Sequence, residues 1–172
     1  LSSFQIGKYE VTEEEWQAVM GKNPSYFKNC DKCPVERVSW NDTQAFLKEL
    51  NKITDKKYRL LTEAEWEYAA RGGNESKVYK YAGSNSLDEV AWYTKTTNDK
   101  GTKEVGTKKA NELGIYDMSG NVFEWCEDWY DENFYKNYVK NNSVNTKKAT
   151  YRVLRGGRWQ GKRMTKKKFI LV

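Results

Sequence analysis

The sequence predicts an α+β fold, with helices in its first half and short strands in its second half. Capping signals and apolar residues at helical spacing indicate three helices before residue 73. After residue 73 the helical spacing fades, and short apolar segments alternate with turn residues. At 172 residues the chain has the length of one domain. We find no internal repeat and no linker long enough to divide it.

Two of the predicted helices begin with a capping box, in which a Thr side chain and a Glu three residues later bond each other's backbone N–H groups. The pairs are Thr12 with Glu15 and Thr62 with Glu65. We expect these helices over residues 13–20 and 62–70, and glycines follow both of them. Between them, apolar residues at helical spacing predict a helix from about residue 41 or 42 to 53.

Four short apolar segments predict strands or ordered loops in the second half of the chain. They are residues 90–93, 114–116, 121–125 and 151–155. Two polar stretches, residues 95–109 and 137–148, predict loops. Trp125 and Trp159 lie beside glycine turns, and we expect both rings to be large core anchors.

The formal net charge of +6 comes mostly from residues 162–172, which contain five Lys and Arg residues. The rest of the chain has 25 basic and 24 acidic residues, with no basic stripe, so we predict no nucleic-acid partner. We assign residues 1–161 to the domain and 162–172 to a short basic tail that ends in a candidate last strand. No apolar run is long enough to cross a membrane. The first residue is Leu1, so we expect the chain to begin inside a longer product.

The chain has no histidine, so a Ser–His–Asp triad, a Cys–His pair and a His-ligated metal site cannot form within it. Of its three cysteines, Cys30 and Cys33 lie in a loop between Pro24 and Pro34. That context is wrong for a thioredoxin-like redox motif, and a zinc half-site would lack partners. We predict a Cys30–Cys33 disulfide, with Cys126 as a buried free thiol. The expected location is therefore extracytoplasmic, secreted or cell-surface.

Several motifs follow one another in a distinctive order. They are GKYEVT at 7–12, PV at 34–35, VSW at 38–40, YRLLTEAEWEYAARG at 58–72, GIYDM at 114–118, GNVFEW at 120–125 and RVLRGGRW at 152–159. This ordered set resembles the formylglycine-generating enzyme family, also called the sulfatase-modifying-factor family. The resemblance implies a C-type-lectin-like fold with two to three helices and small antiparallel sheets. The chain is also similar to retroelement-diversified variable proteins, whose ligand surface follows an Arg-Gly-Gly-Ser-Trp-like segment.

The chain departs from this family where its catalytic residues should lie. Active members carry a copper-binding cysteine pair shortly after the segment equivalent to residues 155–159. Here no cysteine occurs after Cys126, and Arg158 and Leu61 replace the family's usual Ser and Pro. The resemblance therefore implies the scaffold without its chemistry, and we predict no enzyme activity. The alternative is an oxidase of the formylglycine-generating type whose catalytic cysteine segment is missing from this chain.

We predict a non-catalytic domain that binds or displays a ligand, with a protein or glycan partner at a cell surface. Rigid amphipathic rings and Arg are common in recognition surfaces. The candidate ligand-binding residues are Arg158, Gln160, Trp129, Tyr130 and Tyr135. A competing interpretation buries half of the aromatic residues beneath the following loop. An accessory subunit of a cell-surface assembly fits the sequence equally well.

We predict no cofactor. Some members of the family bind calcium, and this chain offers carboxylate and amide oxygens of suitable hardness. The candidates are Asp88, Glu89, Asn98, Asp99, Asn111, Asp117, Asn121, Glu124 and Asp128. Their spacing resembles no calcium-binding loop, so no calcium site is predicted.

Overall fold

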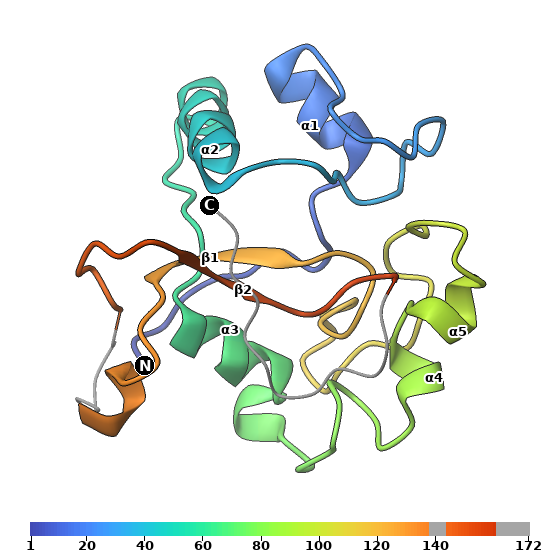
Figure 1. Ribbon diagram of the computed structural model, residues 1–172, viewed down its shortest axis with the longest axis vertical. Helices are drawn as coiled ribbons and strands as arrows, with labels where there is room; N and C mark the ends of the chain where they lie inside the picture. The colour runs from blue at the N-terminus through green and yellow to red at the C-terminus, as the bar shows by residue number, and fades with distance from the viewer. Residues whose placement is uncertain (138–143, 161–172) are drawn as a thin grey trace.

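Three helices in the first half and a two-stranded ribbon in the second organise the structure, a computed structural model that describes residues 1–137 and 144–160 (Figure 1). The predicted basic tail at 162–172 lies outside the described residues. The helices are α1 (Glu13–Met20), α2 (Trp40–Thr54) and α3 (Glu63–Ala70). In Figure 1, α1 and α2 lie on one side of the ribbon and α3 lies on the other. Among the described residues, no helix combines the length and apolarity that crossing a membrane requires.

The capping boxes explain where the early helices begin. Thr12 N donates to Glu15 Oε2 at 2.9 Å and Glu15 N donates to Thr12 Oγ1 at 3.3 Å, so the first box is confirmed. The box predicted before α3 is present as well. Helix α2 starts slightly earlier than expected, because Ser39 and Asp42 form a third capping box. This box was not recognised in the sequence because its acidic residue, Asp42, is an Asp and not the usual Glu or Gln.

The second half has short elements separated by turns. They are η1 (Gly73–Glu75), α4 (Leu87–Val90), α5 (Thr94–Thr97), β1 (Glu124–Trp129), η2 (Phe134–Asn137) and β2 (Arg152–Arg155). The strand expected over 151–155 is confirmed as β2, whereas the one expected over 121–125 begins three residues later as β1. The segment 90–93 instead completes α4 and forms an isolated bridge, 114–116 forms no strand, and α5 interrupts the loop expected over 95–109.

The ribbon pairs β1 with β2 in antiparallel register, Glu124 opposite Arg155 and Trp129 opposite Arg152. The register shifts between these pairs, so the ribbon contains an irregularity of the β-bulge type. The ribbon is therefore short and twisted. The pair Glu124–Arg155 lies at one end and the pair Trp129–Arg152 at the other.

Two hydrophobic clusters support the ribbon. The α3 cluster packs Trp66, Ala69 and Ala70 against residues of β1, β2 and the loop before β1. The α1–α2 cluster contains the stacked rings of Trp16 and Phe46, whose centroids lie 4.7 Å apart. Hydrogen bonds connect the α1–α2 side with the ribbon. Trp40 Nε1 donates to Cys126 O at 3.1 Å, and Trp125 Nε1 donates to Val38 O at 3.0 Å.

The expectation that Trp125 and Trp159 are core anchors is wrong, because both are only half-buried. The indole N–H of Trp125 reaches a backbone carbonyl at the junction of α2 and the ribbon. The ring of Trp159 packs edge-on against Phe27, with centroids 5.0 Å apart. The buried tryptophans are Trp16 and Trp66, which are 4% and 5% exposed.

Candidate functional site

A tight turn before β1 organises the candidate site. Gly120 and Asn121 have φ values of 96° and 56°, in the left-handed region that Gly adopts freely and Asn tolerates. A Cβ at Gly120 would lie 2.4 Å from the backbone oxygen of Trp92, so this position requires glycine. The turn therefore places the Asn121 side chain inward, where it is fully buried.

Asn121 joins three segments that are far apart in sequence. Its Nδ2 donates to Glu10 Oε2 at 2.8 Å and to Lys103 O at 3.1 Å, while its Oδ1 accepts from Lys103 N at 3.0 Å. Its backbone oxygen accepts from Trp159 N at 2.6 Å. The segment containing Lys103 is thus held by the side chain of Asn121, and the segment containing Trp159 by the backbone carbonyl of the same residue.

The disulfide forms the other side of the site. Cys30 and Cys33 are bonded with an S–S distance of 2.02 Å, which confirms the predicted pairing. The carbonyls of Cys33 and Asp31 accept the first free N–H groups of α1, from Glu13 at 2.9 Å and Glu14 at 3.1 Å. The disulfide loop therefore caps α1 with its own backbone.

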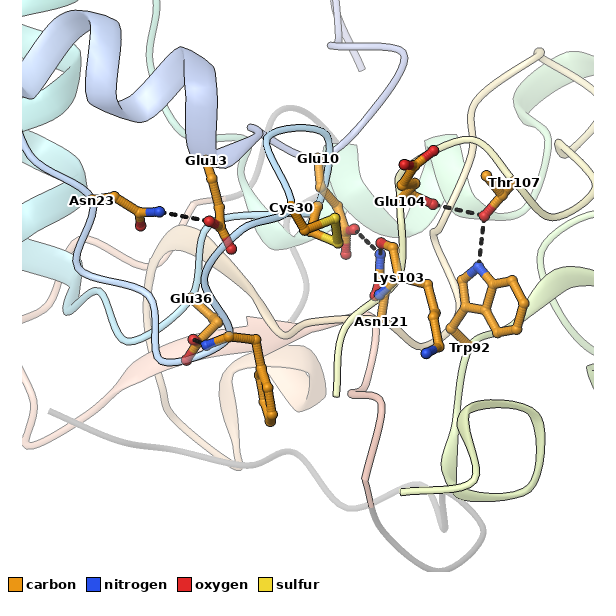
Figure 2. Close-up of a disulfide and its surroundings, with 12 residues drawn as sticks. Glu10, Glu13, Asn23, Cys30, Glu36, Trp92, Lys103, Glu104, Thr107 and Asn121 are labelled. Atoms are coloured by element: carbon orange, nitrogen blue, oxygen red, sulfur yellow. Dashed lines mark hydrogen bonds between the residues drawn. A yellow bond between two sulfur atoms is a disulfide. The ribbon is translucent and has the colours of Figure 1, made fainter. Parts of the chain in front are cut away.

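One further backbone bond connects this loop with the Lys103 segment, because Val105 N donates to Lys32 O at 3.0 Å. Figure 2 shows the disulfide between Glu13 on one side and Lys103 on the other. Glu36 fixes the preceding residues by accepting from the backbone N–H groups of Tyr26 and Phe27, the latter at 3.0 Å. The disulfide loop is thus held by α1 and Val105, and the residues just before it are held by Glu36.

Between these two segments lies a hollow of about 590 Å³. Its lining comes from the disulfide loop and from the segment that Asn121 holds. The lining residues are Tyr26, Phe27, Lys28, Asn29, Cys30, Cys33, Lys100, Thr102, Lys103 and Glu104. The hollow is open to solvent, so it is a surface depression and not an enclosed pocket. We call this feature the lysine hollow, after Lys28, Lys100 and Lys103.

Two of the five predicted ligand-binding residues flank a residue that contacts the lysine hollow. Arg158 and Gln160 are exposed, and Arg158 Nε donates to Gln160 O at 2.8 Å. Trp159, between them in sequence, packs against Phe27 of the hollow. The segment 158–160 therefore adjoins the lysine hollow through Trp159, while the Arg158 guanidinium lies over the ring of Phe123, 5.9 Å from its centroid. We call the hollow and this segment together the ligand face.

The structure places Trp129 and Tyr130 elsewhere. The guanidinium of Arg152 lies between two indoles, 3.6 Å from the ring centroid of Trp40 and 3.7 Å from that of Trp129. This stacking is at the Trp129–Arg152 end of the ribbon, away from the end that leads into 158–160. Tyr130 packs against the α3 cluster. Both rings are half-buried and have structural contacts, Trp129 with Arg152 and Tyr130 with the α3 cluster.

The fifth predicted residue, Tyr135, belongs to η2 by its backbone, and its side chain lies outside the described part of the structure. Sequence reasoning missed the three lysines of the hollow. They stand in polar loops without a motif, and only their position between two fixed segments distinguishes them from other surface lysines.

Three carboxylates, those of Glu10, Asp117 and Glu124, are close enough to influence one another's charge. Burial raises the pKa of Glu10 well above its usual range, and the charges of Glu124 and Asp117 raise it further. Burial raises the pKa of Glu124 to about 7, although a hydrogen bond from Trp66 opposes this. Burial also raises the pKa of Asp117. The cluster therefore favours neutral carboxyl groups unless a cation is close.

The fit of calcium to this cluster is incomplete. Asp117 Oδ1 and Glu124 Oε1 are buried and have no hydrogen-bond partner within the described residues, and such hard oxygens suit calcium. Within residues 1–137 and 144–160, however, no three Cys, Asp or Glu side chains are grouped to share a metal ion. A calcium ion here would need backbone carbonyls as further ligands.

Cys126 is the remaining thiol. It lies in β1 with no exposed surface, and burial raises its pKa well above the usual range of a thiol. The neighbouring carboxylates Glu124, Glu63 and Asp128 raise it further. A thiol in this environment stays protonated and inaccessible, unlike a nucleophilic or metal-binding cysteine.

Helices that cover a short antiparallel ribbon, with long ordered turns between them, define a scaffold of the C-type-lectin-like class. The family of sulfatase-modifying factor enzyme 1-like domains matches residues 1–170. The chain belongs to this family.

Sequence relatives include proteins with different names. The chain is 41% identical to chaperone protein LppX from Paenibacillus barcinonensis, over 92% of the chain and 70% of that protein. It is 35% identical to the formylglycine-generating enzyme of Streptomyces coelicolor, over 72% of the chain and 41% of that protein. It also matches 20% of the length of the serine/threonine-protein kinase pkn1 from Chlamydia caviae, at 34% identity. The chain thus spans less than half of the last two proteins.

Solved structures agree with the fold. Treponema denticola variable protein 1 superposes with a TM-score of 0.76 at 32% identity, over 90% of this chain and 74% of that chain. PvdO from Pseudomonas aeruginosa superposes with a TM-score of 0.71 at 26% identity, over 88% and 67%. The prediction of a C-type-lectin-like fold related to variable proteins is therefore confirmed.

Proposed function

We propose that this domain is a non-catalytic binding module that works outside the cytoplasm. Its ligand face is the surface formed by the lysine hollow and residues 158–160. The disulfide supports that location, because such bonds persist in oxidising compartments. The family scaffold supports the binding role, since its ordered loops present side chains from several distant segments on one surface.

The main support for a non-catalytic role is that no cysteine of the chain is an accessible free thiol. Oxidation of a cysteine substrate by a copper site needs accessible thiolates, because thiolates hold Cu(I). The sequence has three cysteines; two form the disulfide, and the third is buried with a raised pKa. No histidine can substitute as ligand or base. The three cysteines of this chain therefore offer no accessible thiolate to a copper ion, which supports the proposal.

An oxidase assay tests this proposal. Reduced protein is loaded with Cu(I), mixed with a sulfatase-type cysteine peptide in air, and analysed by mass spectrometry for the aldehyde. We expect no aldehyde above a control containing copper and peptide alone. Turnover above that control, lost when any of the three cysteines is replaced, would restore the alternative of a formylglycine-generating oxidase.

We propose a protein as the ligand in preference to a glycan. One relative that covers 92% of the chain is named a chaperone, and a chaperone acts by binding other proteins. The likeness to a variable protein supports a finer version, in which the ligand face is diversified by a retroelement. Sequencing copies of the gene from sister cells tests that version. Differences concentrated at residues 158–160 and beyond would support it, and identical copies would reject it while leaving the binding module in place.

A further inference from the structure

We propose that the lysine hollow binds an acidic peptide segment of a partner protein, with Lys28, Lys100 and Lys103 as the cationic contacts. This inference rests on the proposed function and gives the ligand its chemistry. It depends on three features of the hollow: uncompensated charge, a fixed backbone, and a lining that suits a peptide better than a sulfated glycan.

The first feature is charge. None of the three lysines forms an ion pair within the described residues. Two nearby lysines do: Lys95 pairs with Asp88 and Lys109 pairs with Glu89. The hollow contributes one acid, Glu104, against three cations. Because residues 1–161 are nearly neutral as a whole, this local excess is a specific feature of the face.

The second feature is a backbone that is already ordered. Both backbone polar groups of Lys103 bond the Asn121 side chain, and Lys100 N donates to Thr97 O at 3.1 Å. Lys28 precedes the disulfide, whose loop is held by α1 and by Val105. A ligand therefore orders only the lysine side chains, which lowers the entropic cost of binding.

The hollow also contains a buried polar group that lacks a partner. Thr102 is 6% exposed and lines the hollow, and its Oγ1 makes no hydrogen bond to the described residues. This oxygen is enclosed by protein and is not exposed to a ligand in the hollow. The lysines therefore remain the groups that favour a ligand rich in hydrogen-bond acceptors.

The third feature distinguishes a peptide from a sulfated glycan. Glu104 stands among the lysines, where the N–H groups of a peptide backbone can donate to its carboxylate. Tyr26, which is 68% exposed, and Phe27 offer ring surface to apolar side chains between the acids. A sulfated sugar chain would gain nothing from these rings comparable to an apolar side chain.

The test uses the whole oxidised protein and a fluorescein-labelled deca-glutamate peptide, with fluorescence anisotropy as the readout. Deca-glutamine serves as the neutral peptide, and a labelled heparin hexasaccharide represents sulfated glycans. The variant K28Q/K100Q/K103Q removes the cations of the hollow. Its matched control, K48Q/K56Q/K57Q, removes three exposed lysines that also lack ion pairs but lie on α2 and the loop after it.

We expect deca-glutamate to bind more tightly than deca-glutamine, and raising the salt to weaken that binding. The hollow variant should lose roughly tenfold in affinity and the control variant less than about twofold, because charges matter mainly where they meet the ligand. Both variants should melt near the wild type, since all the replaced side chains are partly or fully solvent-exposed.

Three results would overturn the inference: no binding of deca-glutamate, equal losses in the two triple variants, or binding of the heparin fragment through the hollow in place of the peptide. None of them bears on the oxidase assay. A failure with all three ligands and no aldehyde would therefore reject the acidic ligand and leave the binding module standing, whereas aldehyde formation would reject the module.

Discussion

Replacing Asn121 with alanine tests the framework behind the ligand face. The substitution removes three side-chain hydrogen bonds, two to the backbone of Lys103 and one to Glu10. Each such bond contributes about 1 kcal/mol to the free energy of unfolding. Alanine at φ 56° adds a conformational penalty of about 1–2 kcal/mol. We therefore expect a destabilisation of about 4–5 kcal/mol in total.

The two contributions can be separated with matched variants. Asn121→Gly loses the same bonds but adopts φ 56° without strain, so it should be about 1 kcal/mol less destabilising than Asn121→Ala. Asn98 is exposed and also has a positive φ, 52°, at the C-terminal cap of α5. Asn98→Ala should cost only the conformational contribution, about 1 kcal/mol.

Urea denaturation and thermal melting followed by circular dichroism provide the assay. For a chain of this size 1 kcal/mol corresponds to about 2–4 °C, so Asn121→Ala should melt roughly 10–15 °C below the wild type. If Asn121→Ala melted within about 2 °C of the wild type, or no lower than Asn98→Ala, the buried amide would not be what joins these segments.

Three other perturbations follow from the buried groups. The folded-state pKa of Glu124, about 7, lies above the ordinary value of 4.5, so the free energy of unfolding falls as pH rises from 4.5 through 7. Glu124→Gln should remove up to about 3 kcal/mol of this pH dependence, measured by urea titrations at several pH values. An unchanged pH profile would contradict the assignment. Cys126 should be unreactive to a thiol reagent in the native protein and should give one free thiol after unfolding without reductant, and three thiols would show that the disulfide is absent. Trp66→Ala should cost about 3–5 kcal/mol, and Trp159→Ala clearly less, because the first ring is buried and the second half-buried; equal losses in thermal melts would refute this order.

The early helices were predictable because their signals are local. Thr12 with Glu15 and Thr62 with Glu65 specify a helix start within four residues, and the structure contains both boxes. The start of β1 was not predictable in the same way. The positive φ of Asn121 interrupts the apolar segment 121–125, so only its last two residues enter the strand.

The ligand face was only partly predictable. Arg158 and Gln160 could be named because they flank the tryptophan of a recognisable motif. The lysines of the hollow could not, because Lys28 and Lys103 come from separate loops joined by long-range hydrogen bonds. The stacking of Arg152 on Trp129 could not be predicted either, because the sequence of a strand does not indicate whether another side chain covers an aromatic residue.

The division of the interior into an α1–α2 cluster and an α3 cluster has a kinetic consequence. The disulfide loop is attached to α1, while the Lys103 segment is attached through Asn121 to the turn before β1. Each wall of the hollow is therefore attached to a different part of the molecule, and the bond from Val105 N to Lys32 O joins the two walls to each other. If the halves open independently in hydrogen exchange, a bound ligand should slow amide exchange in both at once, and its residence time should be limited by the less stable half.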